Sequence, residues 1–281
     1  MTRFLPIAMA CTLLLGACKP DDDPKDDTGN PSDDTGDTGD TVPDEPPSDF
    51  VSGSYRVTGM ELLNTGEGFD LDDDGEVNNK LPAVLTLLDL AVQDDMSRDG
   101  LNSTIAAALK SGELVQLIDA TYAERALQYD LLLGAVDELD VLTLDEDQSY
   151  DSEGVPYSRF EGVFLDQVAI DLGPNDVQIP VTFYPDEPAI MIPVWQAIAT
   201  GEATAEGTTC TLGGAIPVDL LMVQVVEPLI PEEGYGDQTK EELLEDIEQL
   251  LSSESVSDIE LEGGLRGISA ALSFIAEPAT W

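Results

Sequence analysis

Three aspartates at alternate positions, followed by a glycine, form the stretch of this chain best suited to chemistry. Asp70, Asp72 and Asp74 are separated by single residues, and Gly75 comes directly after them. Carboxylates at alternate positions of a tightly wound loop converge on one centre, and a glycine permits the sharp turn that the loop needs. Oxygen ligands of this kind suit hard divalent cations. The spacing therefore predicts a metal-binding loop over residues 68–79.

This segment, GFDLDDDGEVNN, resembles the calcium loops of EF-hand and dockerin proteins. The resemblance implies three kinds of ligand: the side chains of Asp70, Asp72 and Asp74, the backbone carbonyl of Glu76, and Asn78, which binds directly or through water. It also implies that Val77 points into the core. We therefore expect calcium as the cofactor. A structural role is favoured over a signalling role, because extracellular calcium sites need be neither tight nor switchable.

The twelfth position of the loop departs from that pattern. Leu81 stands where these loops carry a bidentate glutamate, so the site must recruit another acid, such as Glu67 or Asp89, or bind its ion weakly. No helical pattern precedes the loop, and a helix–loop–helix pair is not expected. The alternative is an acidic turn that caps the next helix. A second acidic cluster, residues 145–151, lacks the glycine and is expected to be a solvated turn.

Histidine is absent, which excludes Ser-His-Asp and Cys-His catalysis as well as histidine-ligated metals. Cys210 would be the only thiol left in a protein that loses its first 17 residues and is lipidated at Cys18. It lies in an expected strand without a cationic neighbour, so we expect a buried structural cysteine rather than a nucleophile. We find no catalytic motif and do not expect an enzyme.

The N-terminus has the features of an export signal. Arg3 precedes an apolar stretch, residues 4–17, that is too short to span a bilayer, and Leu15-Gly16-Ala17-Cys18 follows. This end resembles the lipobox of bacterial lipoproteins, which implies removal of residues 1–17 and acylation of Cys18. The alternative is an ordinary secretory signal. Because Lys19 rather than aspartate follows the cysteine, the resemblance to enterobacterial sorting favours a lipid anchor in the outer membrane.

Residues 18–49 read as an acidic tether. From residue 19 to residue 49 the segment holds twelve acidic residues against Lys19 and Lys25, and Val42 is the only apolar residue in it. Such a composition cannot bury enough surface to fold and predicts a disordered linker. Residues 50–281 are long enough for a single globular domain. The net charge of −47 argues against nucleic acid and anionic lipid headgroups as partners, and favours cations or a basic cell-surface protein.

Hydrophobic patterning predicts an α+β domain: an antiparallel sheet or sandwich decorated by helices. Residues 78–125 hold two helices, about 82–93 and 99–112, which we expect to form a hairpin beside the loop. Residues 126–281 are β-rich. The expected strands are 53–63, 129–133, 136–144, 160–172, 177–183, 203–212, 256–261 and 267–276. A turn at 213–217 leads to a helix reaching about residue 227, and Thr239-x-x-Glu242 is a capping box that begins another helix.

The lipobox, the Asp-Thr-Gly-rich tether, the acidic loop and the later LGGAIP segment together resemble uncharacterised lipoproteins of myxobacteria and related deltaproteobacteria. That resemblance implies a location and metal binding, and no activity. A binding or structural module is the favoured function. A carrier of a hydrophobic ligand is the first alternative, because residues 189–195 and 220–226 are apolar on every side and form either core or a pocket. A carboxylate-only hydrolase, such as a glycosidase, is the second, with candidate acids Asp166, Asp171, Asp186 and Glu187.

Overall fold

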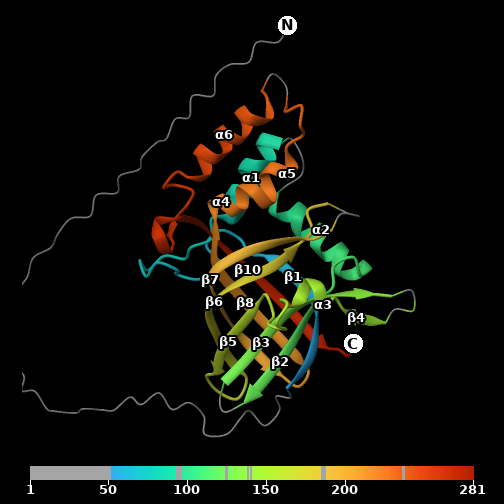
Figure 1. The fold of residues 1–281 in the computed structure, drawn as a ribbon. Coiled ribbons are helices and arrows are strands. Elements are labelled where there is room, and N and C mark those ends of the chain that lie inside the picture. The colour runs from blue at the N-terminus through green and yellow to red at the C-terminus, as the bar shows by residue number, and fades with distance from the viewer. Residues whose placement is uncertain are drawn as a thin grey trace, which may run out of the picture. The chain divides into compact units, whose positions relative to one another are not determined.

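The computed structural model describes residues 52–92, 97–123, 126–137, 139, 141–184, 188–235 and 238–281 (Figure 1). The expected signal, the lipidation site Cys18 and the acidic tether lie outside the described residues. The described residues belong to one compact unit.

Eight antiparallel strands follow one another around a closed barrel (Figure 1). They are β1 Gly53–Leu62, β2 Gln116–Ala123, β3 Ala126–Val136, β5 Arg159–Phe164, β6 Ala169–Val181, β7 Ile190–Thr204, β8 Gly207–Pro217 and β10 Arg266–Pro278. Pairing of β1 with β10, in which Leu62 lies opposite Leu272, closes the barrel. The α+β class is confirmed, but the alternative of a sandwich is wrong. Inward and outward residues alternate in the same way in both architectures, so the pattern alone does not tell them apart.

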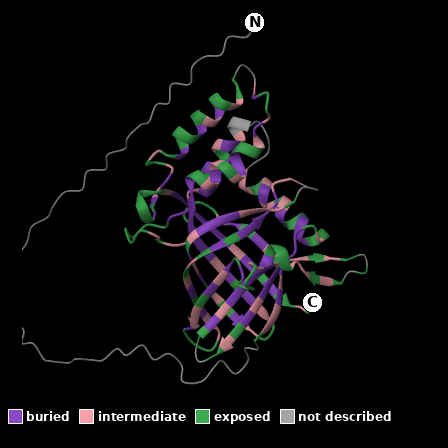
Figure 2. Ribbon diagram, viewed as in Figure 1, coloured by how far each residue is buried: buried purple, intermediate pink, exposed green. Residues whose placement is uncertain are grey.

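The barrel interior is a packed core rather than a channel. Buried positions alternate with exposed positions along most strands, as Figure 2 shows. Tyr129 and Phe160 are among the largest fully buried side chains, and Leu127, Leu172 and Leu212 are buried with them. Eight strands enclose a space that side chains can fill. Burial of each such side chain stabilises the fold by about 1.5–3 kcal/mol.

Helices lie across one end of the barrel (Figure 1). They are α1 Leu81–Val92 and the run α4 Val218–Leu221, π-helix η1 Met222–Val226, α5 Glu227–Leu229 and α6 Lys240–Leu251. We call α1 together with residues 218–251 the cap. The predicted capping box is confirmed: the Thr239 hydroxyl accepts from the Glu242 amide, and the Glu242 carboxylate accepts from the Thr239 amide. The predicted helix from Pro217 is confirmed as well, with the π-helix in its middle.

The two N-terminal helices exist but do not form the expected hairpin. Helix α2, Arg98–Ser111, is capped by Ser97 and ends at Gly112, which has a φ of 83°. It packs mainly on β1, whereas α1 packs mainly on β10 and makes smaller contacts with α2 and α6 alike. The apolar side chains Leu101, Ile105, Ala108 and Leu109 of α2 all enter the main core. Each helix therefore buries its apolar face mainly against the barrel and not against the other helix.

The expected turn at residues 213–217 is wrong, because this segment forms the end of β8. Its two glycines serve close packing instead of chain reversal. A Cβ on Gly213 would lie 2.3 Å from the ring of Phe69, and a Cβ on Gly214 would lie 2.6 Å from Val194. The glycine pair in the sequence therefore indicates a place where other groups approach a strand closely, and not a turn.

The remaining elements are short. Strand β4, Leu142–Leu144, pairs with the end of β3, so the predicted strand 136–144 is a hairpin. The predicted strand 160–172 is likewise divided between β5 and β6. Helix α3, Glu146–Ser149, is capped by Asp145 and replaces the expected turn at 145–151. The predicted strand 256–261 shrinks to β9, Ile259–Glu260, and the 3-10 turn η2, Glu262–Gly264, leads into β10.

Candidate metal site

The structure brings the side chains of Asp70, Asp72 and Asp74 together. One carboxylate oxygen from each lies within 4.8 Å of the others, and all three residues are exposed. The loop is shaped by its own backbone: Asp70 accepts hydrogen bonds from the amides of Asp74 (3.1 Å) and Gly75 (2.8 Å). Gly75 has a φ of 88°, which favours glycine. The predicted convergence of the three carboxylates is therefore present.

The loop is held on the outer wall of the barrel at its base. Phe69 and Asn78 form an isolated antiparallel bridge, in which the Asn78 amide donates to the Phe69 carbonyl at 2.7 Å. The Phe69 ring lies against Gly213 of β8. Leu71 packs on a small apolar cluster formed by Ala215, Ile259 and Leu261 with Trp195. The exposed aspartates thus project from a base that is fixed to the barrel.

A polar connection to β10 completes this base. The carbonyl oxygen of the Asn78 side chain accepts from the Leu71 amide at 2.6 Å. On the other side, Asp258 accepts from the amide (2.9 Å) and hydroxyl (2.6 Å) of Ser269, and lies 3.5 Å from the Asn78 side-chain nitrogen. The Lys80 amide also donates to Ser269. Sequence reasoning missed Asp258, because no local pattern connects it to a loop 180 residues away.

Two of the other expected ligand positions have defined roles in this geometry. Asn78 is buried, and its side-chain oxygen already accepts from Leu71, so it braces the loop. The Glu76 amide donates to the Asp74 carboxylate at 2.8 Å, so Glu76 helps to shape the turn through its backbone. The expectation for Val77 is wrong: its side chain is 44% exposed instead of core-facing. The apolar anchors of this loop are Phe69 and Leu71, and they take the place that Val77 has in the resembled loops.

No fourth acid joins the cluster among the described residues. Leu81 begins α1 and is buried, so the twelfth position contributes to the core. Glu67 accepts from the backbone and side chain of Asn64 at 2.9 Å each, and these hydrogen bonds lower the pKa of Glu67. Asp89 lies within α1. Three converging carboxylates are a set of oxygen donors that fits a hard divalent cation.

The other acids considered from the sequence have different surroundings. Asp166 accepts from the amides of Val168 and Ala169 in the β5–β6 turn, and these hydrogen bonds, that of Ala169 foremost, lower the pKa of Asp166. Asp171 is exposed on β6. Asp186 and Glu187 lie outside the described residues. No catalytic pair is singled out by these placements.

Cys210 lies in β8 and is buried, as predicted. Burial raises the pKa of its thiol to about 12. A thiol with such a pKa is protonated at neutral pH and is a poor nucleophile. The position of Cys210 therefore agrees with a structural role.

Comparison of the chain with protein families, with curated proteins and with solved structures finds no match. Within the described parts of the chain, no helix has both the length and the apolar character needed to span a bilayer.

Proposed function

We propose that this chain is a cell-envelope lipoprotein, anchored in the outer membrane through an acylated Cys18, whose barrel is a binding or structural module stabilised by calcium. The observation that carries the metal assignment is the convergence of Asp70, Asp72 and Asp74 within 4.8 Å. Three like charges at this separation repel one another, and the net charge of −47 adds to that repulsion. A bound cation relieves it.

Binding at this loop stabilises the folded chain, because the three carboxylates converge only when Phe69 and Asn78 hold the base of the loop on the barrel. A ligand that binds only the native state adds about 2.7 kcal/mol of stability at a concentration one hundred times its Kd. Calcium suits the loop better than magnesium. It accepts carbonyl oxygens and water in a flexible geometry, whereas magnesium demands a near-ideal octahedron.

Thermal unfolding of the full chain in calcium, in magnesium and in chelator tests the metal assignment. The variant is Asp72→Asn, which removes one converging carboxylate. The matched control is Asp73→Asn, which removes the same charge from the same loop. Asp73 lies outside the cluster and has a φ of 59°, a conformation that asparagine tolerates.

We expect calcium to raise the melting temperature of the native chain and of Asp73→Asn, and to have little effect on Asp72→Asn. Equal melting of all three proteins with calcium and with chelator would reduce the loop to an acidic turn before α1. An equal loss in both variants would assign the effect to overall charge rather than to a site.

The anchor has its own test. Incorporation of a labelled fatty acid and recovery in the outer-membrane fraction are expected for the native chain, and both are lost in Cys18→Ala. Each buried methylene of an acyl chain contributes about 0.8 kcal/mol to membrane binding. Retention of the label in Cys18→Ala would contradict the proposal.

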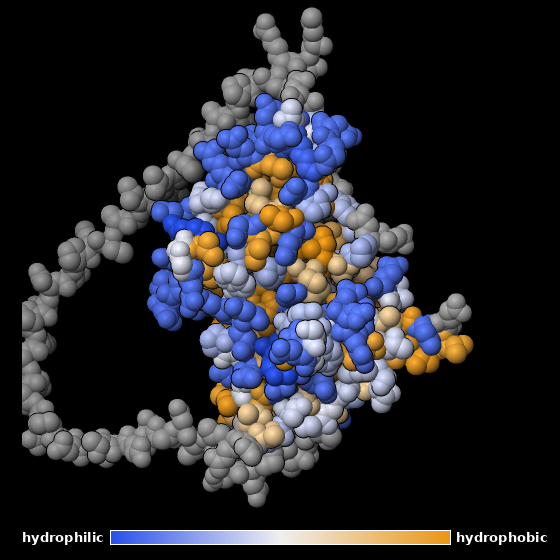
Figure 3. All heavy atoms as spheres, in the orientation of Figure 1, coloured by the Kyte–Doolittle hydropathy of each residue, from blue (hydrophilic) through white to orange (hydrophobic). Residues whose placement is uncertain are grey.

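The surface favours a basic partner. Hydrophilic residues dominate the face shown in Figure 3, and the sequence holds 58 acidic against 11 basic residues. This charge speeds the association of cationic surfaces and slows that of nucleic acid and anionic lipid. A basic cell-surface protein is therefore the class of macromolecular partner that we propose.

A further inference from the structure

An open groove of about 720 Å³ lies on the outside of the barrel, beside β4 and α3 (Figure 1). Its walls are the end of β4, helix α3 and the loop over residues 151–157. The side chains that line it include three acids and two aromatic rings: Glu146, Asp147, Asp151, Tyr150 and Tyr157. The acidic cluster at residues 145–151 thus borders a groove, and this groove shares no residue with the metal loop.

The walls of the groove are held in place by hydrogen bonds. The Ser149 hydroxyl accepts from the Leu133 amide at 2.9 Å and lies 3.2 Å from the Leu133 carbonyl, to which it donates, so α3 is tied to β3. In the loop, the Asp151 carboxylate accepts from the amides of Glu153 (2.8 Å) and Val155 (2.9 Å). A surface that is fixed in advance loses less conformational entropy when a partner binds. The groove therefore has the rigidity expected of a binding surface.

The negative charge of the groove is not neutralised by the protein. The ion pairs in the described parts of the chain include none of its three acids, Glu146, Asp147 and Asp151. Arg159 lies close enough to act on Tyr150, but its guanidinium is already paired with Asp130, at 2.7 and 3.1 Å. Burial foremost, and then the charges of Asp130 and Asp119, raise the pKa of Tyr150. A cationic ligand would relieve this charge.

Two tyrosine rings adjoin the carboxylates. Tyr157 is 49% exposed, and its amide donates to the Ser149 carbonyl at 3.0 Å. Tyr150 packs on the outer apolar cluster that contains Leu117 and Leu132. The face of an aromatic ring attracts a cation, and the planar guanidinium of arginine both stacks on such rings and binds carboxylates through paired hydrogen bonds. A neutral ligand such as a sugar could use the rings but would leave the carboxylates without a counter-charge.

We propose that this groove binds an arginine side chain of a basic partner protein, with the guanidinium held by the carboxylates of the groove and the ring of Tyr157. Complementary charge is the argument for this occupant, because three unpaired acids and two rings line one fixed surface. The inference locates the contact with the basic partner of the proposed function and in that sense rests on it.

Titration of the full chain with the peptide acetyl-Thr-Arg-Thr-amide, followed by NMR, tests the proposal. A second peptide carries citrulline in place of arginine and has nearly the same shape without the charge. At physiological ionic strength the Debye length is about 8 Å, so charges far from the groove contribute little. Glu146→Gln removes a carboxylate of the groove, and Glu245→Gln makes the same change on the exposed face of α6 as the matched control. Tyr157→Leu removes the ring, whereas Tyr157→Phe keeps it.

We expect the arginine peptide to bind the native chain, Glu245→Gln and Tyr157→Phe with equal affinity. The citrulline peptide should bind about tenfold more weakly, because the charge-assisted hydrogen bonds are lost. Glu146→Gln and Tyr157→Leu should each weaken the arginine peptide about two- to fivefold. All the substituted positions are exposed, so the variants should keep the native circular dichroism.

The proposal is overturned if the arginine peptide does not bind, if the citrulline peptide binds as tightly, or if Tyr157→Leu has no effect. Equal weakening by Glu146→Gln and Glu245→Gln would also overturn it, since the attraction would then belong to the whole surface. Poly-lysine, titrated in parallel, reports that overall attraction for basic chains. If poly-lysine binds while the groove fails these tests, the basic partner stands and only its contact site is wrong. The calcium and acylation tests are read from melting temperature and membrane fractionation and are independent of all these outcomes.

Discussion

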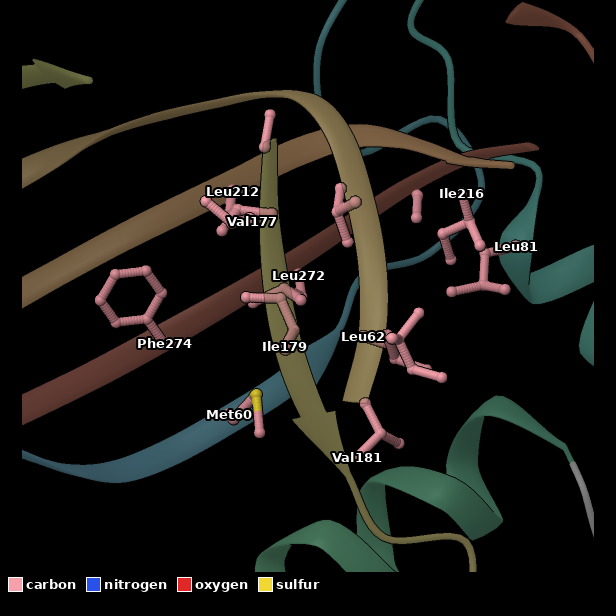
Figure 4. Close-up of a cluster of buried hydrophobic side chains, with 14 of the residues drawn as sticks. Met60, Leu62, Leu81, Val177, Ile179, Val181, Leu212, Ile216, Leu272 and Phe274 are labelled. Carbon is pink, nitrogen blue, oxygen red and sulfur yellow. The ribbon is translucent and has the colours of Figure 1, made fainter. Parts of the chain in front are cut away.

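The two halves of the barrel interior are built differently. Away from the cap, Tyr129, Phe160 and Phe164 fill the space with rings, and the Phe164 ring meets that of Tyr122 edge to face at 5.3 Å. Next to the cap, the interior is lined mainly by aliphatic side chains and contains two small cavities, of about 40 and 10 Å³ (Figure 4). One half is closed by strand hairpins and the other by helices. The difference separates a part of the core that rings fill from a part that retains small cavities.

The ring-filled half also pairs its buried hydroxyl groups. The Tyr129 hydroxyl lies 3.2 Å from that of Thr208, which in turn donates to the Glu202 carbonyl at 2.9 Å. A paired buried group contributes to stability. Substitutions in the two halves should therefore have effects of different size.

The largest expected effect is that of Phe160→Ala in the ring-filled half. Phe160 is fully buried, and its neighbours are held by strand pairing, so the space it leaves cannot collapse. We expect a loss of about 3–5 kcal/mol in the free energy of unfolding, measured by denaturant titration. A loss well below that range would show that this half is as adaptable as the other.

A smaller effect is expected for Leu88→Ala in α1. Leu88 is buried and lines the larger of the two cavities, but the cap can shift to take up part of the space. The loss should be about 2–3 kcal/mol, at the lower end of the range for leucine truncation. Denaturant titration measures this loss, and a loss as large as that of Phe160→Ala would contradict the difference between the two halves.

Local patterns in the sequence predicted those parts of the fold that depend on neighbouring residues. Three features illustrate this: the capping box of α6, the end of α2 at Gly112, and the convergence of Asp70, Asp72 and Asp74. Each of them depends only on residues that lie within a few positions of one another. Each follows from a spacing that has one favourable backbone solution. These elements were therefore accessible without knowledge of the tertiary structure.

Features that depend on distant residues were not accessible. Closure of the barrel by β1 and β10, and the contact of Gly213 with Phe69, join segments far apart in the chain. The same is true of the bond between Asp258 and Ser269, which braces the metal loop. Side-chain direction and partner can be assigned only when the barrel is closed.

Tyr129→Phe tests the paired polar group. It removes the hydrogen bond to Thr208 and should cost about 0.5–1.5 kcal/mol near neutral pH. Burial raises the pKa of Tyr129 above its ordinary value of 10. Above pH 10 the unfolded chain releases this proton while the folded chain retains it, so native stability falls as the pH rises.

The phenylalanine variant lacks that contribution, and its stability should decline less between pH 10 and 11. Tyr157→Phe, at a half-exposed position, is the control and should keep the native slope. Equal slopes in all three proteins would show that Tyr129 does not carry the effect.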